Sequence, residues 1–144
     1  MTGKFTKRPA EDLLYSAQDS LQEATVALMP QDRYAAAHLA ALRTAAAVLA
    51  DRAQVAVGPR RQRIRSAWEL LPEVAPEFGE WAEFFAAGAR KRASAQAGIP
   101  CVTAREADDL VRDAERFLLQ VADSLHCLKQ SSIPIGRTQF LRVS

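Results

Sequence analysis

Cysteine and histidine are scarce in this chain, with two of each among 144 residues. Cys101 and Cys127 lie near opposite ends of one predicted helix, about 35 Å apart at 1.5 Å per residue. A disulfide needs α-carbons within about 7 Å of each other, so the spacing argues against an intrachain bridge and against a shared metal site. Two unpaired thiols are typical of a reducing compartment. We therefore predict no metal ion and no other cofactor.

Long apolar runs and glycine-rich loops are also missing. The longest uncharged stretch, Tyr34 to Leu42, is far shorter than the roughly 20 apolar residues that span a bilayer. The first residues are basic but no apolar segment of a secretory signal follows them. No glycine-rich phosphate loop is present, which argues against a nucleotide-binding domain of that kind. These absences predict a cytoplasmic protein that does not contact a membrane.

The residues that are abundant favour helix. Apolar residues make up 49% of the chain and charged residues 25%, which is typical of a globular protein, and the length suits one domain. Alanine, leucine, glutamate and arginine dominate, and they lose little side-chain freedom in a helix. The net charge of +2 is too small for the chain as a whole to require a nucleic acid partner.

Apolar residues recur at three- and four-residue spacing over four helical units, which span 9–28, 32–55, the pair 60–71 and 77–97, and 103–128. Pro30 is expected to end the first unit and Asp32 to cap the second. Thr103 and Glu106 form a capping-box pattern at the start of the last unit. The predicted fold class is all-α: a single up-and-down bundle of four to five helices over residues 9–128, followed by an extended tail over 129–144.

The same periodicity predicts which residues form the core. Alanines dominate the second unit and allow a neighbouring helix to approach closely, which makes this helix the expected seam of a homodimer. The residues expected to face inward are Leu14, Ala17, Leu21, Ala24 and Leu28 in the first unit; Tyr34, His38, Ala41, Leu42, Ala45, Val48, Leu49 and Arg52 in the second; Ile64, Trp68, Leu71, Phe78, Trp81, Phe84 and Phe85 in the third; and Ala107, Leu110, Ala114, Phe117, Val121, Leu125 and Leu128 in the last.

Three segments together resemble the HEPN family of small all-α domains. They read DLLYSAQDSLQEA from Asp12, DRYAAAHLAALRTAAAVLA from Asp32 and AREADDLVRDAERFLLQVADSL from Ala104, with a helical insert before the third. The resemblance covers residues 12–128, and in composition and length the chain is most similar to small stand-alone actinobacterial members. It implies one of three activities: metal-independent RNA cleavage, RNA binding, or a non-catalytic role as a helical partner.

HEPN ribonucleases carry an Arg-x4–6-His motif, and only Arg33 and His38 match that spacing here. The resemblance implies that His38 acts as the general base and that Arg33 stabilises the charged phosphate. The pair departs from the family in position, since it lies in the second helical unit, and in having Tyr34 where a polar residue is typical. Residues five apart on a helix also point about 140° away from each other. The structural alternative is a solvent-exposed Arg33 and a half-buried, packing His38.

Two basic clusters flank the third unit and are candidates for nucleic acid binding. They consist of Arg60, Arg61, Arg63 and Arg65, and of Arg90, Lys91 and Arg92. Glutamates lie between the two clusters, so the alternative is a solvated helix surface with balanced charges. The terminal sequence QFLRV is expected either to dock on a partner or to fray.

The predicted function is therefore an RNA-linked activity, either binding or metal-independent cleavage, of a HEPN-like homodimer. The alternative is a non-catalytic protein-interaction or dimerisation module that regulates a partner.

Overall fold

The computed structural model of the chain describes residues 9–52 and 66–129, with side chains up to residue 125. These residues form the helices α2 (Pro9–Val26), α3 (Pro30–Arg52), α4 (Ala67–Val74), η2 (Pro76–Phe78), α5 (Gly79–Ala87), α6 (Ala89–Gln96) and α7 (Ala104–Lys129). The described part of the chain contains no strand, which confirms the predicted all-α class. None of its helices is long and apolar enough to cross a membrane.

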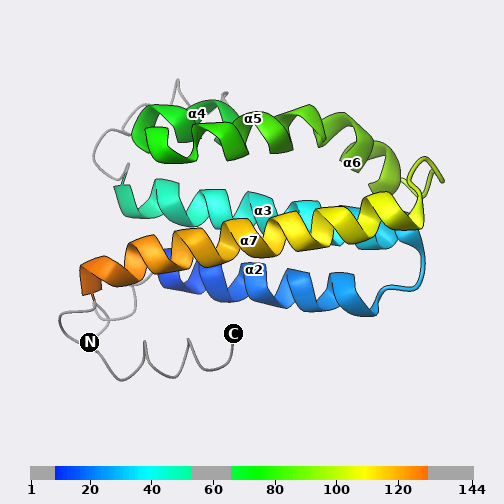
Figure 1. Cartoon of the computed structure of the whole chain (residues 1–144), viewed down its shortest axis with the longest axis horizontal. Helices are drawn as coiled ribbons and strands as arrows, with labels where there is room; N and C mark the ends of the chain where they lie inside the picture. The colour runs from blue at the N-terminus through cyan, green and yellow to red at the C-terminus, as the bar shows by residue number, and fades with distance from the viewer. Residues whose placement is uncertain (1–8, 53–65, 130–144) are drawn as a thin grey trace.

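The helices form an up-and-down bundle with α3 at its centre (Figure 1). The long helices α2, α3 and α7 run alongside one another, and the short helices α4, α5 and α6 form a further layer over α3 and α7. Helix α3 contacts α2, α7, α6 and α4. The described residues therefore form four passes of the chain, of which the third is broken into short helices. The domain bounds of 9–128 stay a prediction.

The alanine-rich helix α3 is buried within the chain itself. Its fully enclosed alanines include Ala37, Ala40, Ala41 and Ala45, and their small side chains let α2 and α7 approach closely. These alanines were expected at the seam of a homodimer, and that placement is wrong because the chain's own helices cover them. Pairing of two copies stays a prediction.

Helix α7 matches its prediction closely. Thr103 and Glu106 form the expected capping box, in which the Glu106 N–H donates to Thr103 Oγ1 and the Thr103 N–H donates to Glu106 Oε1, each at 3.0 Å. The predicted stripe is buried as far as the side chains are described, at Ala107, Leu110, Ala114, Phe117, Val121 and Leu125. The side chain of Leu128 and the residues after Lys129 lie outside the part of the chain that is described, and Lys129 is the last residue of α7, not the first of the predicted tail.

The boundary between the first two units differs from the prediction. Helix α2 ends at Val26, and Pro30 is the first residue of α3 instead of the end of α2. Proline suits that position because the first helical N–H has no partner within the helix. Asp32 lies in the first turn, where its N–H donates to the Met29 carbonyl, and is not the cap. Leu28 is 88% exposed and does not join the buried stripe.

The third unit departs most from its prediction. Ser66 caps α4 by accepting a hydrogen bond from the Glu69 N–H, and Pro72 lies inside this helix instead of ending it. The predicted helix 77–97 is divided at Gly88 into α5 and α6, and Gly98 follows with a φ of 86°. Residues 60–65, including Ile64 and the first basic cluster, lie outside the described residues.

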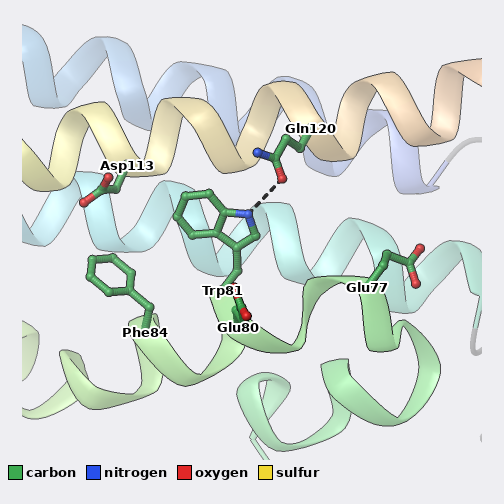
Figure 2. Close-up of a pocket in the computed structure, with 6 residues that line it drawn as sticks. All are labelled: Glu77, Glu80, Trp81, Phe84, Asp113 and Gln120. Carbon is green, nitrogen blue, oxygen red and sulfur yellow. Dashed lines mark hydrogen bonds between the residues drawn. The ribbon is translucent and has the colours of Figure 1, made fainter.

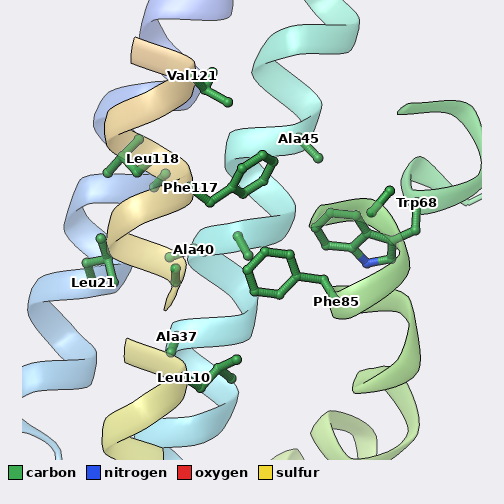
Figure 3. Close-up of a cluster of buried hydrophobic side chains, with 14 of the residues drawn as sticks. Leu21, Ala37, Ala40, Ala45, Trp68, Phe85, Leu110, Phe117, Leu118 and Val121 are labelled. Atoms are coloured by element: carbon green, nitrogen blue, oxygen red, sulfur yellow. The ribbon is translucent and has the colours of Figure 1, made fainter. Parts of the chain in front are cut away.

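An aromatic cluster between the third unit and α7 fills the core (Figure 3). Phe117 of α7 lies 5.4 Å from Phe85 and 6.4 Å from Trp68, measured between ring centroids. Phe78 is also buried, as predicted. The prediction fails for Phe84, which is 46% exposed, and holds only in part for Trp81, which is half-buried. These two rings border the groove described below.

Candidate functional site

Arg33 is held by two partners at one end of the bundle. Its Nη1 donates to Asp108 Oδ1 of α7 at 2.5 Å, and its Nη2 donates to the Ala27 carbonyl at 2.8 Å. The guanidinium thereby fixes the turn between α2 and α3 against the start of α7. Arg33 is thus neither free in solvent nor directed at His38.

His38 is enclosed by aromatic rings and is 2% exposed. The ring centroids of Tyr34, Trp68 and Phe85 lie 6.5, 6.0 and 5.9 Å away. Its Nε2 lies 2.9 Å from the Phe85 carbonyl, which can only accept, so Nε2 carries the proton. The buried Nδ1 has no hydrogen-bond partner among the described residues. Arg33 and His38 therefore share no partner among the described residues, and His38 joins α3 to α5. Their catalytic role stays a prediction.

Burial lowers the pKa of His38, and the hydrogen bond to the Phe85 carbonyl offsets only part of that effect. The neutral ring is therefore favoured in the folded chain, while the unfolded chain takes up a proton near pH 6.5. The stability that this produces is complete above pH 6.5 and is lost as the pH falls towards the lower, folded pKa.

We expect the free energy of unfolding to fall as the pH drops below about 6.5, and we expect His38→Gln to remove most of this loss. A glutamine amide can still donate to the Phe85 carbonyl but does not titrate. Urea unfolding over a pH series measures both proteins. Carboxylates such as Glu106, whose pKa is lowered by the hydrogen bond from the Thr103 N–H, titrate at lower pH. They are present in both proteins, so they do not contribute to the difference between the two pH profiles. If the free energy of unfolding had the same pH dependence in the unaltered chain and in His38→Gln, titration of His38 would not be the cause of the loss.

The second basic cluster is not one uncompensated patch. Lys91 Nζ lies 3.0 Å from Glu106 Oε2, and this pairing raises the pKa of Lys91. Arg90 is exposed, whereas Arg92 is half-buried with its Nε enclosed. One of the three cations is thus already neutralised. Nucleic acid binding by Arg90, Lys91 and Arg92 stays a prediction, as does binding by Arg60, Arg61, Arg63 and Arg65.

A groove between α5 and α7 encloses about 450 Å³ (Figure 2). We call it the α5–α7 groove; its lining residues are Glu77, Glu80, Trp81, Phe84, Asp113 and Gln120. From the sequence, the glutamates were expected to balance the charge of the basic clusters, and the two aromatic residues were expected to lie in the core. Their spacing held a signal nevertheless: positions 77, 80, 81 and 84 follow the helical repeat of one face, and 113 and 120 are two turns apart.

Trp81 forms the rigid part of this groove. Its indole Nε1–H donates to Gln120 Oε1 at 2.9 Å, which links α5 to α7 (Figure 2). Its ring packs 5.6 Å from Phe85 and 5.4 Å from Phe117. Phe84 meets it edge to face at 6.2 Å. The groove therefore presents two aromatic surfaces, one of them fixed by a hydrogen bond and by the core.

The groove is acidic. Glu77 is already paired with Arg52, whose Nη1 lies 2.7 Å from Glu77 Oε2. Asp113 lies 3.8 Å from Arg116, and burial raises the pKa of this carboxyl. Glu80 has no ion-pair partner among the described residues. Such a site attracts cations and repels phosphates.

A metal centre has no support in the described part of the chain, where no three His, Cys, Asp or Glu side chains gather as ligands. Cys101 is an exposed free thiol. The side chain of Cys127 is outside the part of the structure that is described. The groove's chemistry is accordingly that of aromatic rings and carboxylates.

Comparison with known proteins gives one family match. The model of the SAV_6107-like HEPN family matches residues 24–122, which is more than half of the chain and includes the α5–α7 groove. No curated protein and no solved structure matches the chain. The fold predicted from the resemblance and the fold observed agree with this match, and the chain belongs to the HEPN family.

Proposed function

We propose that this HEPN domain is a non-catalytic interaction module that binds a partner protein through the α5–α7 groove. The observation that carries the proposal is the groove itself, in which exposed Phe84 and half-buried Trp81 lie among three carboxylates. Aromatic side chains in concave sites are typical energetic centres of protein interfaces. This corresponds to the alternative function predicted from the sequence.

RNA is a poor fit to this groove. Proteins bind RNA mainly through cations that neutralise phosphates, and the groove offers carboxylates instead. RNA cleavage by Arg33 and His38 would require the His38 ring to leave the Phe85 carbonyl and its aromatic surroundings. It would also require Arg33 to leave Asp108, within one chain or towards a second copy. The Arg-x4–6-His spacing is all that supports this second candidate.

The test is selection of random displayed peptides on the immobilised full chain. We expect enriched peptides to lose at least about tenfold in affinity for Phe84→Ala, because hot-spot aromatics commonly contribute that much. Leu119→Ala is the matched control: Leu119 is an exposed residue of α7 outside the groove. It should bind the same peptides as the unaltered chain.

The unaltered chain should not cleave a structured RNA pool in the presence of EDTA. Two results would overturn the proposal. One is that no enriched peptide depends on Phe84, and the other is RNA cleavage that His38→Gln abolishes. The second result would make the chain a metal-independent ribonuclease with His38 as its base.

A further inference from the structure

We infer that the α5–α7 groove receives an arginine side chain of the partner protein, with its guanidinium stacked on Trp81 beside the edge-to-face ring of Phe84 and paired with Glu80 and Asp113. The inference rests on the proposed function and specifies the chemistry that the groove recognises. It follows from the aromatic surfaces, from the carboxylates that lack a close partner, and from the size of the groove.

The aromatic surfaces suit a planar cation. Gln120 and the rings of Phe85 and Phe117 fix the Trp81 indole in place. Phe84 stands edge to face beside it, so a group entering the groove meets one immobile ring and one more exposed ring. Cations bind over the faces of aromatic rings, tryptophan most strongly, and arginine does so more often than lysine.

The carboxylates supply the complementary charge. Glu77 is neutralised by Arg52 at 2.7 Å, which leaves Glu80 and Asp113 to interact with a ligand. Asp113 comes from α7 and lies across from Phe84 of α5 (Figure 2). Among the described residues, Asp113 forms an ion pair only with Arg116 one turn later. This contact is long, at 3.8 Å, and a guanidinium seated directly on Asp113 would outcompete it. A desolvated carboxylate gains more from a close cation than an exposed one does.

The choice of arginine over lysine follows from shape. A guanidinium is planar, is weakly hydrated, and can stack on an aromatic ring while its edges donate to carboxylates. An ammonium group is compact and strongly hydrated and cannot do both. A volume of about 450 Å³ accommodates a long side chain together with part of the backbone that carries it. The acidic rim would repel the free carboxylate of an amino acid, which favours an arginine within a peptide.

The experiment uses ¹⁵N-labelled full chain and four probes: N-acetyl-arginine methylamide, the corresponding citrulline and lysine compounds, and free arginine. Citrulline has the shape of arginine without its charge. The chain has two tryptophans and hence two indole N–H signals. Trp81 reports on the groove, and buried Trp68 serves as an internal control. We expect the capped arginine to shift the Trp81 and Gln120 side-chain signals and to leave Trp68 unchanged, with an affinity on the order of 1 mM.

Groove variants then test the contacts. Glu80→Gln and Asp113→Asn should each weaken capped arginine by about fivefold, the usual effect of losing one partly exposed ion pair of about 1 kcal/mol. Glu83→Gln is the matched control, since Glu83 is an exposed glutamate of α5 that does not line the groove. It should bind as the unaltered chain does. Lysine should bind more weakly than arginine, and citrulline should produce no saturable shift.

Other results overturn the inference. Equal binding of citrulline and arginine would show that charge is not recognised, and equal loss in all three variants would indicate a non-specific cation effect. Tighter binding of free arginine than of the capped form would identify a small-molecule site. Selected peptides that depend on Phe84 but contain no arginine would reject the inference while leaving the proposed function intact.

Discussion

Replacing Phe117 with alanine is expected to lower the free energy of unfolding by about 4 kcal/mol, which is the usual effect of removing a buried phenyl ring. Phe117 is 0% exposed and stands at the centre of the aromatic cluster. Its ring lies 5.4 Å from both Trp81 and Phe85 and 5.9 Å from Phe78. No small movement of α7 can fill a cavity bordered by rings from both α5 and η2.

Urea unfolding followed by circular dichroism measures this loss. Leu119→Ala is the control from the same helix: Leu119 is 38% exposed, and its truncation should cost less than about 1 kcal/mol. Since a domain of this size is stable by only about 5–15 kcal/mol, Phe117→Leu provides a milder variant, with an expected loss of about 1.5 kcal/mol. If Phe117→Ala cost no more than Leu119→Ala, the aromatic cluster would not be the centre of the core.

The second large effect is expected at Gly88, where alanine should destabilise the chain by about 2 kcal/mol. A Cβ at this position would lie 2.8 Å from Tyr34 Oη. Tyr34 is buried and stacks on His38, so it has little room to withdraw. The backbone of Gly88, with φ −90° and ψ −1°, is open to any residue. The loss would therefore come from the contact with Tyr34 alone.

A double-mutant cycle tests that origin. Tyr34→Phe removes Oη, after which the nearest atoms to the new Cβ, the Phe85 carbonyl oxygen and His38 Cδ2, lie 3.7 and 3.8 Å away at ordinary contact distance. Gly88→Ala should then cost less than about 0.5 kcal/mol in the Tyr34→Phe background. If the stability losses of Gly88→Ala and Tyr34→Phe were additive in the double variant, the contact with Tyr34 Oη would not be the cause of the Gly88→Ala effect.

Local signals made the long helices predictable. The stripe from Ala107 to Leu125 and the capping box at Thr103 depend only on residues within one helix, so α7 followed directly from its sequence. The close approach of Gly88 to Tyr34 could not be predicted, because Tyr34 belongs to another helix. Pro30 was misplaced because proline is equally suited to the position after one helix and to the first position of the next.

The candidate site was harder to predict for the same physical reason. The spacing of Arg33 and His38 says nothing about their partners, which lie 75 and 47 positions away at Asp108 and Phe85. The α5–α7 groove left a periodic signal on α5, but that signal is the same for a core face and for a binding face. A core face and a binding face differ in how deeply Trp81 and Phe84 are buried against α7. That burial depends on tertiary packing, which the sequence of α5 does not reveal.

The bond between Trp81 and Gln120 joins residues 39 positions apart. The two walls of the groove thus meet only when the chain is folded, and the unfolded chain offers a partner no equivalent surface. Any ligand of the groove must then add its binding free energy to the stability of the whole bundle. At a hundred times its Kd, a ligand contributes about 2.7 kcal/mol in this way. A partner can therefore act on this domain as a thermodynamic stabiliser that sets how much of it stays folded.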